Sequence, residues 1–160
     1  MNKLELKDLA PYLPYGLSCH AMGESNEGKP ILFTLMGLSD DLLNHKHAEL
    51  WAGENENGTT EDIITMALDD TFPLLRPMSD LTEEITHGGD TFVPLHRILE
   101  AYCFDLSKMD GKEILSFRES LIEVDMSYKT VQMLCEWHID FQGLIGRGVA
   151  INLQTIDNGK

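Results

Sequence analysis

The residues of this chain that could do chemistry are few, and the first group combines histidines, a cysteine and an acid. His45 and His47 are two residues apart, Glu49 follows them, and Cys19-His20 lies upstream. Imidazole, thiolate and carboxylate groups are the usual ligands of zinc, so this set could form the centre of a small metal-dependent hydrolase. On a helix, residues two apart do not face each other, so chelation would require a strand or a loop. We interpret the histidines as exposed and solvated, and we predict no metal site and no cofactor.

A second candidate is His138, which falls on the apolar arc of a predicted helix. A buried histidine can be a tuned acid or base. More commonly it belongs to a core and donates a hydrogen bond to a backbone carbonyl, which is the interpretation we favour. The chain has no serine or cysteine in a nucleophile motif such as G-x-S-x-G. We therefore predict no catalytic residue and a protein that is not an enzyme.

Two further patterns resemble binding motifs without matching them. Gly146-Arg147-Gly148 is a fragment of a glycine-rich loop, but no Gly-Lys-Ser/Thr follows, so neither a P-loop nor a dinucleotide fingerprint is present. The calcium-loop pattern D-x-D-x-D-G is absent from three acidic pairs of the chain, Glu61-Asp62, Asp69-Asp70 and Glu83-Glu84. We interpret the glycines as a turn and the acids as solvated surface.

The acidity of the chain is its most unusual property. Its 160 residues include 27 acidic and 12 basic side chains, a net charge of −15, whereas a hydrophobic content of 42% is that of a globular protein. This charge repels nucleic-acid phosphate and anionic membranes, so we expect no direct binding to either. Solubility, divalent cations or a basic protein partner remain as reasons for the charge.

The cysteines and the N-terminus predict a compartment. Cys19, Cys103 and Cys135 are odd in number and irregularly spaced, so we expect no disulfide framework, which fits a reducing cytoplasm. The first ten residues carry charges where a signal peptide has an apolar run, and no segment is apolar over the length of a membrane span. We expect one cytoplasmic domain over residues 1–160.

The elements that would position these residues are organised around residues 128–142, which show the strongest helical pattern. Ser127 offers an N-cap oxygen and Gly143 a residue that tolerates positive φ at the end. The apolar arc is about 200° wide, and because a surface helix has an arc of about 100°, protein should lie on two sides of this one. Its polar strip would consist of Lys129, Gln132, Glu136 and Asp140.

The N-terminal half predicts a short helix and a hairpin. Residues 3–10 have helical spacing, and Pro11 and Pro14 should end the helix. Residues 16–22 and 31–38 have strand patterns and flank turn residues, which predicts an antiparallel hairpin. We also expect a Ser39-capped helix over 40–51 and a polar loop over 53–60. Residues 61–70 fit either a strand or a helix turn, and we favour a third strand because Pro73 and Pro77 follow soon after and the hairpin needs a third partner.

The C-terminal half completes an α+β fold. Asp80 and Glu83 have the spacing of a capping box. We expect a turn at 87–90, strands over 91–94 and 113–124, a helix over 95–104, and a tail with one short strand over 143–156. The predicted fold is a small antiparallel sheet of three to five strands with the 128–142 helix packed across it.

Three segments carry a resemblance to a known family. LELKDLAPYLPYGL (residues 4–17), PLLRPMSDLTEEI (73–85) and GLIGRGVAINLQTI (143–156) resemble the signature blocks of a family of short, uncharacterised bacterial proteins common in prophages and mobile elements of anaerobic gut bacteria. In that family the last block has a Glu-Lys pair where this chain has Gly146-Arg147. The resemblance implies a phage or mobile-element context and transfers no catalytic residue.

Three functions are compatible with these observations. The favoured one is a non-enzymatic, element-encoded acidic protein that binds another protein, in particular as a decoy on the basic surface of a nucleic-acid-binding protein. The second is a structural or assembly accessory whose acidity is incidental. The third and weakest is the metal-dependent hydrolase of His45 and His47.

Overall fold

The largest element of the fold is a six-stranded sheet with the order β4-β3-β2-β1-β5-β8, seen in a computed structural model that describes residues 3–26, 29–40, 46–51, 64–123 and 126–157. Its strands are β1 (Ser18–Asn26), β2 (Lys29–Asp40), β3 (Lys46–Trp51), β4 (Ile64–Ala67), β5 (Thr71–Leu75) and β8 (Ile151–Asn152). All neighbours are antiparallel except β5 and β8, which are parallel. The α+β class is confirmed, but the prediction of a small, purely antiparallel sheet is wrong.

The predicted hairpin is the β1–β2 pair. Cys19 lies opposite Phe33 and His20 opposite Leu32. Because side chains alternate across a strand, the first pair is buried while Leu32 on the other face is 44% exposed. The buried face of the sheet is built by Cys19, Ala21, Phe33, Leu35, Ala48 and Leu50.

The predicted Ser39-capped helix is wrong. Ser39 and Asp40 belong to β2, and Lys46–Trp51 is β3, which pairs with β2. Residues 41–45 lie outside the described residues. Ala48 and Leu50 are buried and alternate with less buried neighbours. This two-residue alternation of burial is that of a strand, although the apolar residues of the segment also fit helical spacing.

The third strand predicted within 61–70 is present as β4, which pairs with β3, while residues 53–60 and 61–63 lie outside the described residues. A 3-10 turn, η2 (Leu68–Asp70), leads into β5. Pro73 does not end a strand but lies inside β5, opposite Cys19 and at the last position of the β1 ladder. At that position its missing amide interrupts the fewest ladder bonds.

The N-terminal segment covers the buried face of the sheet. It consists of α1 (Leu6–Leu9) and a 3-10 helix, η1 (Ala10–Tyr15), which ends where Gly16 has φ +61°. The α-helix thus ends before Pro11, as predicted, and the chain continues in 3-10 geometry, with Pro11 in the first turn, where it needs no amide partner. Tyr12 is fully buried.

The remaining elements form the other end of the molecule: η3 (Met78–Thr82), β6 (Ile85–His87), β7 (Asp90–Phe92), α2 (Pro94–Ala101), η4 (Leu106–Lys108) and α3 (Gly111–Glu123). The predicted turn at 87–90 joins β6 to β7, and the helix predicted over 95–104 is α2. The predicted strand 113–124 is instead α3, whose Ile114, Phe117 and Leu121 have helical spacing. The N-cap of η3 is Pro77, so Asp80 forms no capping box.

The predicted central helix is shorter than expected. It is α4 (Tyr128–Glu136), and the Ser127 hydroxyl accepts a hydrogen bond from the Thr130 amide at 3.2 Å, as an N-cap should. His138 has φ +57°, which a helix excludes, so the helix ends before it rather than at Gly143. The next residues form a parallel bridge between Ile139 and Arg76. The chain ends with β8 and α5 (Leu153–Asp157).

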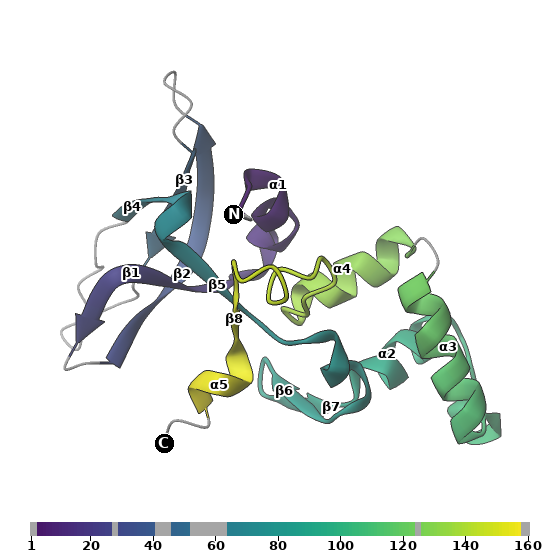
Figure 1. The fold of residues 1–160 in the computed structure, drawn as a ribbon. Helices are drawn as coiled ribbons and strands as arrows, with labels where there is room; N and C mark the ends of the chain where they lie inside the picture. The colour runs from purple at the N-terminus through teal and green to yellow at the C-terminus, as the bar shows by residue number, and fades with distance from the viewer. Residues whose placement is uncertain (1–2, 27–28, 41–45, 52–63, 124–125, 158–160) are drawn as a thin grey trace.

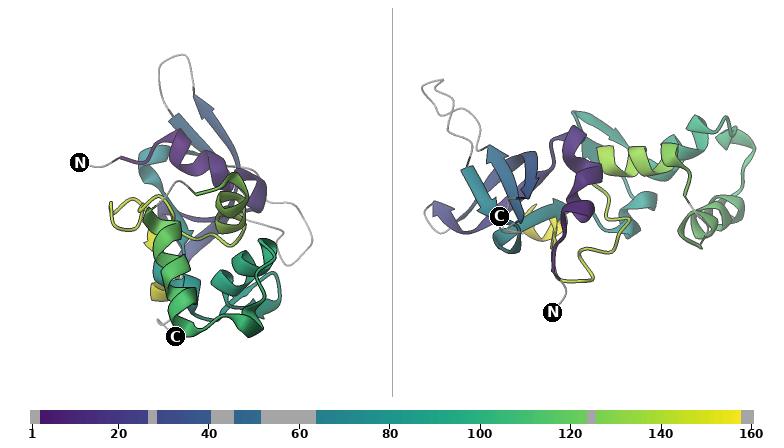
Figure 2. Two further views of the ribbon diagram at one scale, coloured as in Figure 1. Left: turned by 90° about the vertical axis from the view of Figure 1, so that its right-hand side faces the viewer. Right: turned by 90° about the horizontal axis from the view of Figure 1, so that it is seen from above.

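Two hydrophobic clusters make up the core, and α4 contacts both. The sheet-side cluster includes Cys135 and Val131 of α4, and the other includes Leu134 and Trp137. Protein on two sides of this helix is therefore confirmed, although α4 packs on η1 instead of lying across the strands. Figure 1 shows the sheet and the helices α2–α3 at opposite ends, and the view from above in Figure 2 shows the elongated shape. Among the described residues no helix is long and apolar enough to cross a membrane.

Candidate functional site

The structure does not bring the predicted zinc ligands together. Cys19 and His20 lie on β1 and His47 and Glu49 on β3, with β2 between these strands. His20 is opposite Leu32 and His47 opposite Ser39, positions seven residues apart along β2, or roughly 23 Å. Burial raises the pKa of the Cys19 thiol to about 12, so it does not favour the thiolate that zinc needs.

The hydrolase interpretation gains no support from this geometry. His45 lies outside the described residues, and within the described part of the chain no group of three or more histidine, cysteine or acidic side chains could hold a metal. All three cysteines are described and unpaired: Cys19 and Cys135 are buried, and Cys103 is exposed.

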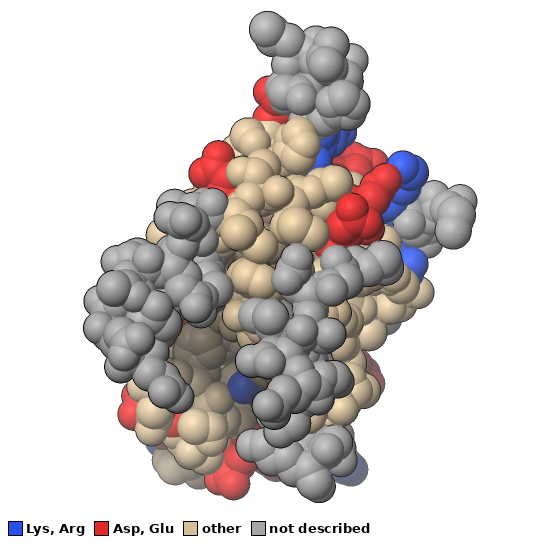
Figure 3. Space-filling view, turned by 90° about the vertical axis from the view of Figure 1, so that its left-hand side faces the viewer, with Lys and Arg blue, Asp and Glu red and all other residues tan. Residues whose placement is uncertain are grey.

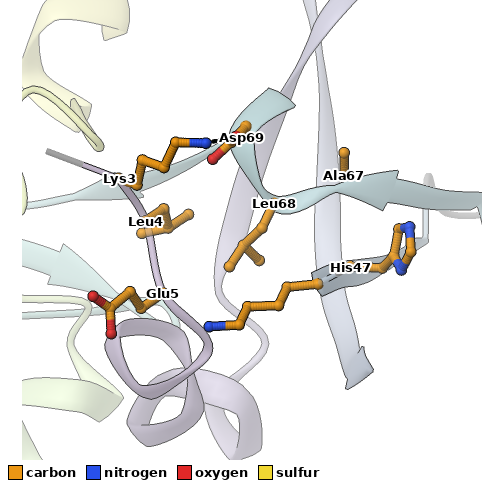
Figure 4. Close-up of a pocket in the computed structure, with 8 residues that line it drawn as sticks. Lys3, Leu4, Glu5, His47, Ala67, Leu68 and Asp69 are labelled. Atoms are coloured by element: carbon orange, nitrogen blue, oxygen red, sulfur yellow. Dashed lines mark hydrogen bonds and ion pairs between the residues drawn. The ribbon is translucent and has the colours of Figure 1, made fainter. Parts of the chain in front are cut away.

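A pocket of about 590 Å³ lies between the N-terminal segment and the sheet edge, and is lined by Lys3, Leu4, Glu5, Lys46, His47, Ala67, Leu68 and Asp69. Lys3 Nζ and Asp69 Oδ2 form an ion pair of 2.5 Å, and Glu5 pairs with Lys7 at 2.8 Å. In Figure 4 the His47 ring points away from Lys3, Leu4 and Glu5. The carboxylates of this pocket are therefore ion-paired and its histidine faces elsewhere, which is not the arrangement of a nucleophile with its base.

The best-formed polar contacts hold the chain together and join the three segments that resemble the prophage family. Arg147 donates to Asp8 through Nη1 at 3.1 Å and through Nη2 at 3.0 Å, which links the third segment to the first. Gln154 donates to Asp80 at 2.9 Å, and β8 pairs with β5, which links the third segment to the second. The three segments are thus one contiguous part of the fold.

Asp8 and Asp140 are both buried, and each has a structural role. Burial is the largest single influence and opposes the charge of Asp8, but the hydrogen bonds from Arg147 and the Glu5 amide, together with the charges of Arg147 and Lys7, outweigh it and lower the Asp8 pKa. Both carboxylate oxygens of Asp140 accept backbone amides, from Leu144 at 2.7 Å and from Ile145 at 2.8 Å. Asp140 is only 5% exposed, so its predicted place on a polar helix strip is wrong.

His138 makes the backbone hydrogen bond favoured from the sequence, from a half-buried position. Its Nε2 is 3.0 Å from the Tyr15 carbonyl, which can only accept, so the ring donates there. Its ring meets the His87 ring edge-on at 5.2 Å. Burial lowers the pKa of His138, the Tyr15 contact opposes this, and His87 and Arg76 add to the lowering. Burial and Arg76 likewise lower the pKa of His87, and Glu136 opposes.

The glycine-rich segment 146–148 was predicted to be a turn, and the three acidic pairs were predicted to be solvated surface. The segment 146–148 is a turn, but its Arg147 is an anchor that the sequence analysis missed because its partner is 139 positions away. Asp69, Glu83 and Glu84 are exposed and Asp70 is half-buried. Glu61 and Asp62 lie outside the described residues.

Acidic side chains are concentrated in the part of the chain that forms the sheet. Residues 18–75 contain eleven acidic and two basic side chains, a net charge of −9 out of −15. On the face shown in Figure 3 the described carboxylates form separate groups with uncharged surface between them. Seven of the 27 acidic residues lie outside the described residues, six of them within 18–75.

Comparison with known protein families, with curated proteins and with solved structures finds no match to this chain. The resemblance to prophage-borne proteins stays a prediction.

Proposed function

We propose that this protein is a non-enzymatic acidic protein, encoded by a phage or mobile element, that binds a basic partner protein through its sheet end. The sheet end is defined here as β1–β5 with α1 and η1. In its specific form, the protein occupies the basic surface of a nucleic-acid-binding protein and acts as a decoy for nucleic acid. The observation that supports this most is the net charge of −9 within residues 18–75. Such a charge attracts a cationic surface and speeds encounter with it.

The acids of the sheet end are available for this role. Three buried acids, Asp8 of α1 and, outside the sheet end, Asp80 and Asp140, accept hydrogen bonds within the fold. By contrast, Asp40 and Asp69 are exposed, and Glu49 and Asp70 are half-buried. These four acids of residues 18–75 therefore reach solvent.

The accessory role is the second candidate, and one observation favours it. A decoy needs carboxylates in a continuous stripe, whereas the described ones in Figure 3 are in separate groups. Under the accessory role the charge is incidental, and a partner would bind without regard to it.

The two roles are separated by binding measurements on two charge variants. The first, called the sheet-end variant, changes to their amides four acids that lie in the sequence between β3 and β4: Glu54, Glu56, Glu61 and Asp62. The control changes four exposed acids elsewhere, Glu83, Glu84, Asp90 and Glu136, to their amides. Each variant and the wild type are used as bait in a bacterial extract at low salt, with and without competing duplex DNA.

The decoy role predicts capture of basic nucleic-acid-binding proteins that duplex DNA releases. Capture should fall as salt rises toward about 0.15 M, where exposed charges are screened beyond roughly 8 Å. The sheet-end variant should capture much less than wild type and the control variant nearly as much. Capture that ignores salt, duplex DNA and the sheet-end acids would contradict the proposal in favour of the accessory role.

A further inference from the structure

The end of the molecule opposite the sheet carries a groove that the charge-based function does not use. The helical end is defined here as η3, β6, β7, α2, η4 and α3. The groove lies where α2 ends, beside α3 and the start of α4, and measures about 400 Å³. It is lined by Tyr102, Phe104, Phe117, Ser120, Leu121, Met126, Ser127 and Thr130. All eight residues belong to the described part of the chain.

Exposed apolar side chains are concentrated in the part of the chain that forms this groove. Among the described residues six large apolar side chains are exposed, and four of them lie within 102–128: Tyr102, Phe104, Leu115 and Tyr128. Phe104 is 45% exposed and packs edge-on against Phe117 at 5.5 Å between ring centroids. Exposed aromatic surface gathered in one place marks a docking site more often than scattered apolar residues do.

The polar groups of the groove are already engaged within the chain. The Tyr102 hydroxyl is hydrogen-bonded to the hydroxyls of Ser127 and of Thr130, the latter at 2.9 Å. Lys129 donates to the Ala101 carbonyl at 2.5 Å, and its ammonium lies 5.4 Å from the Tyr102 ring centroid. The groove is walled by helices and presents no sheet edge, so an extended segment would find no ladder to pair with. An occupant must satisfy its own backbone hydrogen bonds, as a helix does.

The charge of the molecule decides what kind of helix fits. Residues 94–130 contain seven acidic and five basic side chains, and the whole chain carries −15. A second copy of the chain would bring another −15 and be repelled, whereas a helix with cations beside its apolar face would be attracted.

We propose that this groove is the docking site for an amphipathic helix of a basic partner protein, with the partner's apolar side chains inserted beside Phe104 and Phe117. The proposal rests on the proposed function, since it assumes a basic protein partner. It adds a second binding surface to the first. The sheet end attracts the partner through its charge, and the groove binds the partner's helix.

The test uses a synthetic helix of about 18 residues, with leucines along one face and lysines on the other, as the probe. A control peptide has the same composition with its leucines distributed around the helix. Binding is measured by fluorescence anisotropy to the wild type and to three variants. Phe104→Glu places a charge in the groove, Ser120→Trp fills it from an exposed position of α3, and Met36→Glu changes a side chain that is 52% exposed on β2.

The proposal predicts that the wild type binds the amphipathic peptide in preference to the control peptide. Phe104→Glu and Ser120→Trp should each weaken binding by about tenfold, as expected for a buried anchor. Met36→Glu should change it by no more than about twofold. Thermal melts of each variant identify any that fail to fold, and Ser120→Trp, which removes no core side chain, provides the test if Phe104→Glu does not fold.

Several results would overturn the proposal. These are equal effects of Phe104→Glu and Met36→Glu, no preference for the amphipathic peptide, or self-association of the wild type that Phe104→Glu abolishes, which would assign the groove to a second copy. Groove-dependent peptide binding combined with partner capture that ignores the sheet-end acids would contradict the proposed function and leave this inference standing. Peptide binding that is unchanged in the groove variants, combined with partner capture that depends on the sheet-end acids, would contradict this inference and leave the proposed function standing.

Discussion

The sheet end and the helical end differ in what they expose. Residues 18–75, which form β1–β5 of the sheet end, carry a net charge of −9, and the helical end has three of the six exposed large apolar side chains of the described residues, Tyr102, Phe104 and Leu115. Each end has a hydrophobic cluster of its own. Long-range attraction and short-range apolar contact are therefore assigned to opposite ends of one elongated molecule (Figure 2).

The two ends are joined by the short segment 134–139, which makes both apolar contacts and a hydrogen bond. Leu134 packs in the helical-end cluster and Cys135, its neighbour on α4, in the sheet-end cluster. Just beyond α4, the Ile139 carbonyl accepts a hydrogen bond from the buried Tyr12 hydroxyl at 2.9 Å. We expect damage to this segment to affect both ends at once, whereas surface changes at either end should stay local.

The largest effect should come from the core of the junction. Leu134 is 1% exposed, so Leu134→Ala should lower the free energy of unfolding by about 2–5 kcal/mol through lost burial and a residual cavity. Gln132→Ala, at an exposed position of the same helix, should stay within about 0.5 kcal/mol. Denaturant unfolding measures both, and equal costs would mean that the orientation of α4 is wrong.

A smaller effect is expected from the Arg147–Asp8 pair. Arg147→Ala leaves the Asp8 carboxylate, whose side chain is 3% exposed, without its two guanidinium bonds. The loss should be about 1–3 kcal/mol, because part of the guanidinium is solvated and screened. In the double variant with Asp8→Asn the cost should be less than the sum of the single costs. Strict additivity would show that the pair does not couple the first and third segments.

The smallest effect concerns pH at the histidine pair. The pKa of His138 and that of His87 are lowered in the fold, so the unfolded chain binds protons first as pH falls. Stability should therefore be constant above about pH 6.5 and decrease as pH falls below it, until the folded histidines also protonate. His138→Asn keeps a residue that tolerates positive φ and removes the proton, so it should flatten the slope between pH 7 and about 5.5. His96→Asn, at an exposed position, is the matched control and should leave the slope unchanged.

What the sequence predicted well was local. The β1–β2 hairpin follows from two strand patterns around a turn, and Ser127 caps α4 because an N-cap interaction spans only three residues. Two predictions were wrong because the period of the apolar residues was misassigned. Ala48 and Leu50 fit a strand as well as a helix, and Phe117 and Leu121 have the helical spacing that the strand prediction overlooked.

What the sequence could not predict depends on distant partners. No local pattern marks His138 as the residue that ends α4 with φ +57°, because its ring is held by Tyr15, 123 positions away. The local sequence predicts Asp140 on the surface of a helix, whereas in the fold its carboxylate accepts hydrogen bonds from the amides of Leu144 and Ile145. The groove likewise combines residues that follow α2 with residues of α3 and of the start of α4, and no single stretch specifies how they pack.

The division between the two ends is tested most directly by the rates at which the partner captured from extract binds and leaves. Charge accelerates association, whereas buried apolar anchors slow dissociation. The account predicts that the sheet-end amide variant associates about tenfold more slowly at low salt with little change in dissociation. It predicts that Phe104→Glu dissociates about tenfold faster with little change in association. Two variants that alter the same rate, or a sheet-end variant that alters neither, would contradict it.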